Sequence, residues 1–201
     1  MITPRFKQTK TYLKTMNEAK STDLSTFNNS WYNPGSPVRR ALWYVINVAC
    51  FLNPLFPFSS LKCHLLRLFG AKVGKGVVIK PRVNIKHPWM LSIGDHTWIG
   101  EQAWIDNLGQ VTIGKNVCLS QGAMLLCGNH NYKKASFDLI VGAILLEDGV
   151  WIGAHSIVCP GVSCAAHSIL SVNSVATKNL EALGIYQGNP AQYLRKRNIE
   201  S

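Results

Sequence analysis

The chain has 201 residues, enough for one or two domains, and 47% of them are hydrophobic, which is enough to build a core. Its 21 Lys and Arg residues exceed its 10 Asp and Glu residues, and the formal net charge of +11 indicates an anionic partner such as a phosphate-rich cofactor or a membrane surface. The basic residues are scattered and no nucleic-acid-binding motif accompanies them, so nucleic acid is not expected as the partner.

Residues 1–22 are predicted to be a flexible tail, because residues 1–20 are polar and rich in lysine. They lack the apolar core that an export signal needs. The six cysteines contain no Cys-x-x-Cys pair and are interpreted as reduced thiols. These features predict a cytoplasmic protein and leave association with the inner face of the membrane open.

Residues 23–70 are predicted to be a hydrophobic, helical accessory segment. Apolar and aromatic residues dominate positions 38–58, but Asn47 and Pro54 interrupt the run, which falls short of the roughly 20 residues that a membrane-spanning helix needs. A helix that packs on the rest of the protein is favoured, and a helix in a membrane interface remains open. A second, amphipathic helix is expected at residues 60–69 and should end at the glycine that follows.

The feature that organises the rest of the chain is a six-residue repeat. An aliphatic or small residue returns at Val73, Ile79, Ile85, Ile93, Ile99, Ile105, Ile113, Leu119, Leu125, Leu146, Ile152, Val158, Cys164, Leu170 and Ala176. The residue two positions before is usually small or β-branched, and residues two apart in a strand share one face. The pattern predicts a parallel β-helix, in which stacked coils bury a core that no single coil could bury.

The spacing of these positions also predicts where the coils turn. Three repeats close one triangular coil, and two extra residues follow every third repeat, first between Ile85 and Ile93 and then between Ile105 and Ile113. One corner of the triangle therefore carries longer turns than the other two.

About five coils are expected over residues 71–178, on the order of 25 Å tall at roughly 4.8 Å per strand. The helix at residues 60–69 is expected to cover the open first coil, whose edge strands would otherwise be unpaired. Residues 179–201 are expected to form a short basic C-terminal segment.

The repeat is interrupted once, where 21 residues instead of six separate Leu125 from Leu146. The interruption predicts a loop at residues 127–145 that projects from one corner, and insertions in repeat proteins commonly form the working surface. His130 lies near the start of this loop. Because histidine is a natural general base near neutral pH, His130 is the candidate catalytic residue.

Several motifs together define a resemblance to a known family. They are the hexapeptide pattern, the loop motif Gly128-Asn129-His130, the string Val150-Trp151-Ile152-Gly153-Ala154-His155, the segment Val175-Ala176-Thr177-Lys178 and the ending Gly188-Asn189-Pro190-Ala191. Over about residues 23–197 the chain resembles the left-handed β-helix acyltransferases, and within them the colanic-acid-type exopolysaccharide O-acetyltransferases. These motifs are specific for the fold and for acyl transfer, and much weaker for the acceptor.

The resemblance implies a homotrimer that binds acetyl-CoA in grooves between neighbouring chains. It implies transfer of the acetyl group to a saccharide hydroxyl in exopolysaccharide or surface-polysaccharide biosynthesis. His130 would act as the base in a direct transfer without an acyl-enzyme, and no metal is expected. The acceptor could be lipid-linked, and peripheral membrane contact remains open.

The resemblance also implies roles for residues outside the loop histidine. Cofactor binding is expected for Trp151, Ala154, Val172, Thr177, Lys178 and Arg195, and acceptor binding for Asp106, Asn107 and Asn129. Trp151 stands between two inward positions and should point outward, where contact with the pantetheine arm of CoA and contact between subunits are both open. Lys178 and Arg195 could instead be solvated surface charges, and Asp106 and Asn107 ordinary turn residues.

Three other functions are compatible with parts of the sequence. Cys127 and His130 could form a nucleophile pair, although a cysteine in such a turn is commonly structural. A three-histidine metal site of the carbonic anhydrase type needs a close histidine pair, and the histidines here are widely spaced. A non-catalytic sugar-binding or scaffolding trimer is not excluded by the fold, but the histidine-bearing loop favours catalysis.

Two short segments depart from the family pattern. Cys164-Ala165-Ala166-His167 replaces the usual repeat, so the fifth coil is expected to be less regular than the others. Ser171-Val172-Asn173 stands where the family carries a Gly-Ala-Gly run at its cofactor site.

Overall fold

The computed structural model describes residues 21–200, which fall into two compact units. The prism unit consists of residues 32–129 and 140–200, and the loop unit of residues 21–31 and 130–139. The tail predicted at residues 1–22 lies outside the described residues except for its last two positions.

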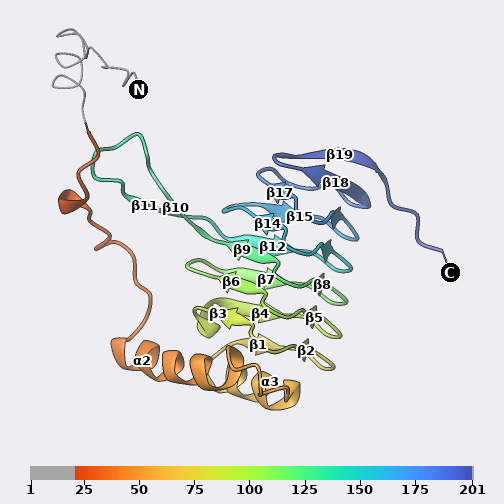
Figure 1. Cartoon of the computed structure of the whole chain (residues 1–201), viewed down its shortest axis with the longest axis horizontal. Coiled ribbons are helices and arrows are strands. Elements are labelled where there is room, and N and C mark those ends of the chain that lie inside the picture. The colour runs from red at the N-terminus through yellow and green to blue at the C-terminus, as the bar shows by residue number, and fades with distance from the viewer. Residues whose placement is uncertain (1–20, 201) are drawn as a thin grey trace, which may run out of the picture. The chain divides into compact units, whose positions relative to one another are not determined.

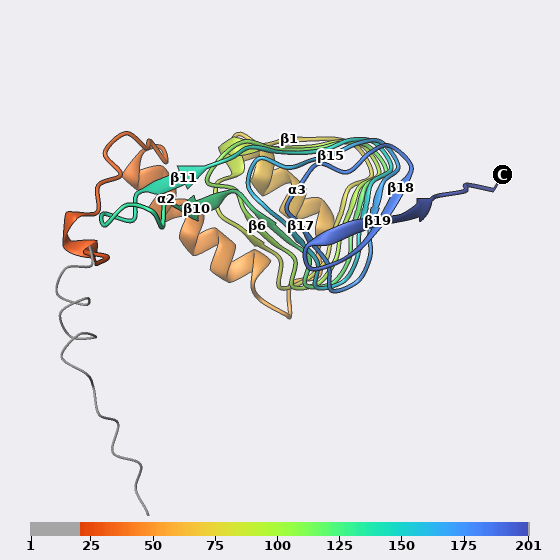
Figure 2. The same cartoon turned by 90° about the horizontal axis from the view of Figure 1, so that it is seen from above.

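The prism unit is built from three sheets whose strands are parallel except for β19, and each of the first five coils contributes one strand to every sheet (Figure 1). Sheet A contains β1 (Lys72–Val73), β4 (Leu91–Ile93), β7 (Val111–Ile113), β12 (Ile144–Leu146) and β15 (Ser163–Cys164). Sheet B contains β2 (Val78–Ile79), β5 (Trp98–Ile99), β8 (Cys118–Leu119), β13 (Trp151–Ile152), β16 (Ile169–Leu170), β18 (Gly184–Gly188) and β19 (Ala191–Lys196). Sheet C contains β3 (Asn84–Ile85), β6 (Trp104–Asp106), β9 (Met124–Leu126), β14 (Ile157–Val158) and β17 (Val175–Ala176). The coils lie over one another in Figure 2, as a parallel β-helix requires.

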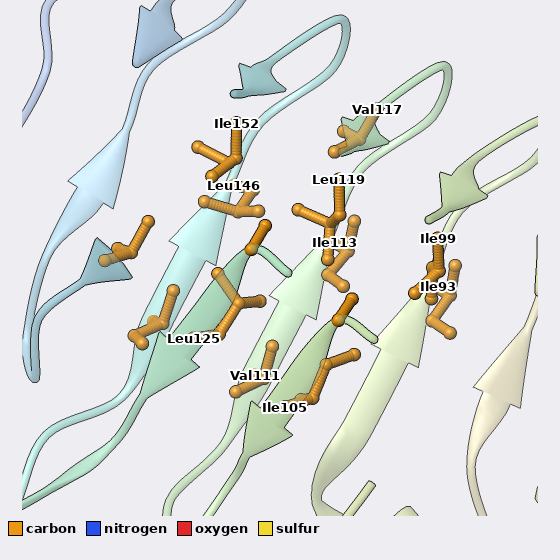
Figure 3. Close-up of a cluster of buried hydrophobic side chains, with 14 of the residues drawn as sticks. Ile93, Ile99, Ile105, Val111, Ile113, Val117, Leu119, Leu125, Leu146 and Ile152 are labelled. Carbon is orange, nitrogen blue, oxygen red and sulfur yellow. The ribbon is translucent and has the colours of Figure 1, made fainter. Parts of the chain in front are cut away.

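The repeat residues of each coil stand in register with those of the next. Ile93, for example, pairs with Val73 on one side and Ile113 on the other. Apart from Val73 in the first coil, all the repeat positions are buried. Figure 3 shows the side chains of some of them, such as Ile113 and Leu146, between the strands. The glycines that follow some of them permit this stacking, because a Cβ on Gly94 would lie 2.5 Å from the carbonyl carbon of Gly114 in the next coil.

The longer turns all lie at the corner between sheet C and sheet A. The short 3-10 helix η3 (Pro88–Met90) follows β3, residues 107–110 follow β6, and the loop insertion follows β9. The insertion therefore begins at the same corner as the two-residue extensions, one coil further along. Within the insertion, β10 (Gly128–His130) and β11 (Leu139–Val141) form a two-stranded sheet.

The expectation of a less regular fifth coil is wrong. Ser163 and Cys164 pair in register with Leu145 and Leu146, and Cys164 is completely buried. Burial raises the pKa of the Cys164 thiol to about 12, so the side chain stays neutral and packs as a small hydrophobic residue.

The prism continues beyond residue 178. Leu180 forms a parallel bridge with Cys164 in sheet A, and β18 pairs with β16 in sheet B, which begins a sixth coil. Strand β19 then returns antiparallel to β18 across a turn that contains the cis Asn189–Pro190 peptide bond. About half of the C-terminal segment of residues 179–201 is therefore a strand pair that extends sheet B.

Two helices lie against the first coil: α2 (Pro37–Ile46), continued by the π-helical turn η2 (Asn47–Phe51), and α3 (Ser59–Leu68). Helix α3 confirms the helix expected at residues 60–69. No helix among the described residues 21–200 is long and apolar enough to cross a membrane.

Side chains of these helices satisfy the exposed edge of the first coil. Trp43 Nε1 donates to the carbonyl oxygen of Ile85 at 2.7 Å, and the Nζ of the fully buried Lys62 donates to that of Lys80 at 2.9 Å. Arg67 Nε donates to the carbonyl oxygen of the first strand's last residue at 3.0 Å. Trp43 and Arg67 take the place of the N–H groups of a preceding coil, so these carbonyl oxygens of the edge strands keep their hydrogen bonds.

Candidate active site

The loop unit places His130 in a defined orientation. Its Nδ1 lies 2.8 Å from the carbonyl oxygen of Phe137, and because a carbonyl only accepts, Nδ1 carries the proton and donates it. The imidazole stacks on the Phe137 ring, with centroids 4.4 Å apart and planes 9° apart, and the Phe27 ring lies 5.9 Å away at a tilt. The lone pair therefore resides on Nε2, which is the tautomer that a general base of fixed orientation needs.

The backbone around this hydrogen bond is unusual. Phe137 has a φ of +51°, in the left-handed region that large side chains rarely occupy. The loop is also tied to the N-terminal part of its own unit, because the Asp23 N–H donates to the carbonyl oxygen of Ala135 at 2.8 Å. Strained backbone held by its surroundings is frequent at functional sites, and here it presents the carbonyl that fixes His130.

The corner of the prism that precedes the loop carries Asp106 and Asn107. Both Asn107 side-chain atoms are engaged, since Oδ1 accepts from the His87 N–H at 2.9 Å and Nδ2 donates to the His87 carbonyl oxygen. Asn107 is completely buried and offers no surface to an acceptor, so its side chain holds the turns of two coils together. Asp106 keeps a small exposed fraction and forms an ion pair with Lys86 at 2.9 Å.

A cavity of about 280 Å³ opens beside this ion pair. Its wall combines aromatic and charged groups of both signs, with Tyr44 and Arg40 from α2 and Lys86, Trp104 and Asp106 from the coils. Aromatic faces and charged hydrogen-bonding groups around one cavity are a suitable surface for a polar, ring-shaped ligand.

His87 lies beneath the same corner and should make the fold sensitive to acid. Burial lowers its pKa below the usual 6.5, opposed by the hydrogen bond to the Asn107 carbonyl oxygen; Lys86 and Arg40 lower it further, and Asp106 raises it. The unfolded chain takes up a proton near pH 6.5 and the folded chain only at lower pH, so the free energy of unfolding falls as the pH drops below about 6.5.

Urea unfolding from about pH 8 to about pH 5 measures this effect. The His87→Gln variant should lose part of the acid dependence, whereas His64→Gln, on the exposed surface of α3, should keep it. An acid dependence that is identical in the wild type and in His87→Gln would contradict the assignment.

Four of the residues predicted to bind the cofactor lie on one side of the prism unit. Trp151 points outward from β13 and is 45% exposed, as expected, between buried Val150 and Ile152. Ala154 and Val172 occupy the same turn after sheet B in successive coils, and the N–H of the residue after Val172 donates to the Ala154 carbonyl oxygen at 2.9 Å. Arg195 lies on β19, which belongs to sheet B as well.

The other two residues predicted to bind the cofactor lie at a different corner of the prism. Thr177 and Lys178 follow β17 at the far end of sheet C, and both are exposed. A single chain therefore presents the predicted cofactor residues at two corners of the triangle. Asn129, predicted to bind the acceptor, is exposed on β10 directly before His130.

Two outward tryptophans are not among the site residues predicted from the sequence. Trp98 and Trp104 directly precede repeat residues, as Trp151 does, and all three are exposed on the faces of the prism. Trp98 stands in the same column of sheet B as Trp151, whose Nε1 donates to Ser120 Oγ at 2.9 Å. The position before each repeat residue would have identified them, because alternate residues of a strand point to opposite faces.

The structure argues against Cys127 as a nucleophile. Cys127 is completely buried, and burial raises the pKa of its thiol to about 11, so the reactive thiolate is scarce at neutral pH. Its Sγ donates to the carbonyl oxygen of Gly109. Across residues 21–200, no group of three or more His, Cys, Asp or Glu side chains is arranged to hold a metal ion.

Comparisons with known proteins indicate the same class of protein as the sequence motifs. No family model matches the chain. The putative colanic acid biosynthesis acetyltransferase WcaF of Escherichia coli is 33% identical over 176 residues, which cover 87% of this chain and 97% of that protein. The galactoside O-acetyltransferase of Escherichia coli is 26% identical over 142 residues, covering 67% of this chain and 68% of the relative.

Among solved structures, a hexapeptide-repeat-containing acetyltransferase from Vibrio cholerae, complexed with acetyl coenzyme A, superposes with a TM-score of 0.74 at 22% identity. The superposition covers 83% of this chain and 93% of that one, and it confirms the predicted left-handed β-helix fold. The identity to WcaF and its nearly complete coverage confirm the family and the enzyme class. The chain belongs to the hexapeptide-repeat acetyltransferases, among which it groups with the colanic-acid type.

Proposed function

We propose that the protein transfers an acetyl group from acetyl-CoA to a hydroxyl of a saccharide, with His130 as the general base. The observation that carries this proposal is the fixed orientation of His130. Its Nδ1–H donates to the Phe137 carbonyl oxygen, with 2.8 Å between the two heavy atoms, and its ring stacks on the Phe137 ring with centroids 4.4 Å apart. A sugar hydroxyl is a poor nucleophile near neutral pH and needs its proton removed as it attacks.

The proposed reaction is a direct transfer. The hydroxyl oxygen attacks the thioester carbonyl carbon while Nε2 of His130 takes the hydroxyl proton. When the tetrahedral intermediate collapses, the carbon–sulfur bond breaks, and the proton on Nε2 passes to the departing CoA thiolate. Backbone N–H groups of a coil turn are proposed as donors to the intermediate's oxyanion. The buried thiol of Cys127 argues against an acyl-enzyme on that residue.

The acyl donor is acetyl-CoA, as expected from the sequence and as bound by the Vibrio cholerae neighbour. Trp151, Ala154, Val172 and Arg195 are proposed to contact it from one chain, and Thr177 and Lys178 from another. Their positions at two corners of the prism support a groove between copies of a homotrimer. The exposed tryptophans support the same assembly, because large apolar side chains on outer faces favour contact between subunits.

The acceptor is proposed to be a saccharide of an exopolysaccharide or surface polysaccharide, by analogy with the names of WcaF and the galactoside acetyltransferase. Asp106 and Asn129 remain the proposed acceptor contacts, and Asn107 is proposed to position Asp106 by fixing the turn. A cytoplasmic location is proposed because acetyl-CoA serves as the donor and because all six cysteines are unpaired thiols. Linkage of the acceptor to a lipid stays a prediction.

The stacking of His130 on Phe137 gives a first test. Phe137→Ala removes the ring but keeps the carbonyl acceptor, so kcat should fall roughly tenfold while the KM for acetyl-CoA changes little, because the base loses part of its orientation. The assay is acceptor-dependent CoA release detected with a thiol reagent. Tyr132→Ala removes an exposed ring from the same loop and should leave kcat unchanged. Equal rates for Phe137→Ala and the wild type would rule out an orienting role.

A further inference from the structure

The positive charge of the protein is concentrated at one end of the prism. Residues 24–94 contain no Asp or Glu, yet they contain the nine basic residues Arg39, Arg40, Lys62, Arg67, Lys72, Lys75, Lys80, Arg82 and Lys86. Nine of the eleven net charges thus belong to the segment that forms α2, α3 and the first coil. The basic residues are scattered along the sequence, but the net positive charge is concentrated in this segment because its basic residues have no acidic residue among them.

Most of these charges face solvent without a carboxylate partner. Arg40, Lys72, Lys75, Lys80 and Arg82 are exposed. Among the ion pairs of residues 21–200, one involves this segment, and it joins Lys86 to Asp106. A surface of this kind carries a strong positive potential that neighbouring acidic groups do not cancel.

The helices at the same end are apolar on two faces. One stripe of α2 and η2, which includes Trp43 and Phe51, is buried against the first coil. A second stripe, formed by Val38, Leu42, Val45, Val48 and Leu52, is exposed. A helix that is apolar on both faces normally has both covered, so the exposed stripe indicates a further contact.

The exposed apolar surface continues into the next segment. Leu55, in the turn between η2 and α3, is 86% exposed, and Phe58, Leu61 and Leu68 are exposed as well. Figure 1 shows α2 and α3 lying across the end of the prism next to β1 and β2. We call this combined surface the N-terminal face; it comprises the exposed residues of α2, η2, α3 and the first coil.

We propose that the N-terminal face docks on an anionic lipid bilayer. A bilayer surface offers both hydrocarbon for the apolar stripe and negative charge for the surrounding lysines and arginines. A second copy of this face would be a poor partner, because both faces would carry the same uncompensated positive charge. The helices are too short to span the bilayer, so they would lie in its interface. This inference does not depend on the identity of the acceptor.

Vesicle flotation with the full-length protein tests the proposal. The wild type should bind vesicles of equimolar phosphatidylglycerol and phosphatidylcholine at least tenfold more strongly than vesicles of phosphatidylcholine alone. Binding should weaken as salt is added, because salt screens exposed charges. Leu55→Ser combined with Phe58→Ser should lower the partition constant at least tenfold, since both side chains lose the hydrocarbon contact. Leu194→Ser, an exposed leucine on β19, should have no effect.

The charge contribution has a closely matched control. Lys75 and Lys115 occupy the same corner in the first and third coils, and each backbone N–H donates to an aspartate Oδ1 at 2.7 Å. Lys75→Gln should weaken binding about fivefold, the contribution of one basic residue near an anionic leaflet, whereas Lys115→Gln should change nothing.

Three results would overturn the proposal. They are recovery of the wild type in the vesicle-free fraction at low salt, equal losses for Lys75→Gln and Lys115→Gln, and unchanged vesicle binding by the Leu55→Ser and Phe58→Ser double variant. If the double variant instead lowered the molecular mass of the protein measured by light scattering without affecting vesicle binding, the N-terminal face would be an interface between copies of the chain. Circular dichroism confirms that each variant is folded before it is compared.

Discussion

Replacing His130 with glutamine should lower kcat by about 10²- to 10⁴-fold. Glutamine keeps a polar side chain of similar reach but cannot take the proton of the attacking hydroxyl. The KM for acetyl-CoA should stay close to the wild-type value, because the lost interaction forms only as the reaction proceeds. Steady-state rates of acceptor-dependent CoA release, measured over a range of acetyl-CoA concentrations at saturating acceptor, give both quantities.

The same substitution at His64 provides the control, since this histidine lies exposed on α3 in the other unit of the protein. His64→Gln should retain full activity. A His130→Gln enzyme with near-wild-type kcat would eliminate His130 as the base.

Truncation of Leu146 to alanine should lower the free energy of unfolding by about 2–5 kcal/mol. Leu146 is 0% exposed and stands in register with Ile113 and Cys164 at the centre of the stacked core. Removing its side chain loses buried apolar contact and leaves a cavity that rigid neighbouring coils cannot fill. Urea unfolding followed by circular dichroism measures the difference at fixed protein concentration.

The adjacent residue in the same strand, Leu145, provides a matched control for Leu146→Ala. Leu145 is 37% exposed because alternate residues of β12 point to opposite faces. Leu145→Ala should therefore cost less than about 1 kcal/mol, as surface substitutions usually do. Similar losses for the two variants would mean that the register of β12 is not the one described.

The fold could be predicted from the sequence because each coil repeats the same requirement. A buried residue every six positions, as at Ile93, Ile99 and Ile105, determines the inward face, and the spacing reveals the corners. The end of the prism was harder to predict. Tyr186 and its neighbours on β18 carry no hexapeptide mark, yet β18 pairs with β16 and extends sheet B.

Other features depend on contacts that the repeat does not encode. The sequence pattern places Lys62 on the polar side of an amphipathic helix. In the structure its side chain is buried, and its Nζ donates a hydrogen bond to the carbonyl oxygen of Lys80 at the edge of the first coil. The residues after Cys164 depart from the usual repeat, yet Cys164 is buried at its repeat position and the coil stays in register.

The candidate site was predictable in part. The single long interruption indicates His130 as the candidate base. Its tautomer, however, depends on a hydrogen bond to the carbonyl oxygen of Phe137, seven residues away. Phe137 has a left-handed backbone conformation that no sequence motif predicts. Asn107 was expected to bind the acceptor, and the structure shows its side chain buried against the backbone of His87. Such roles follow from the stacking of coils and could not be read from spacing alone.

Mass spectrometry of the products tests the central claim, acetyl transfer to a saccharide with His130 as the base, most directly. The protein is incubated with isotope-labelled acetyl-CoA and a panel of monosaccharides, nucleotide sugars and lipid-linked saccharides, in parallel with His130→Gln. We expect the wild type to place one labelled acetyl group on at least one saccharide, as a base-labile ester, and the variant to form far less of it. Saccharide binding without any acetylated product would contradict it and identify the protein as a sugar-binding trimer.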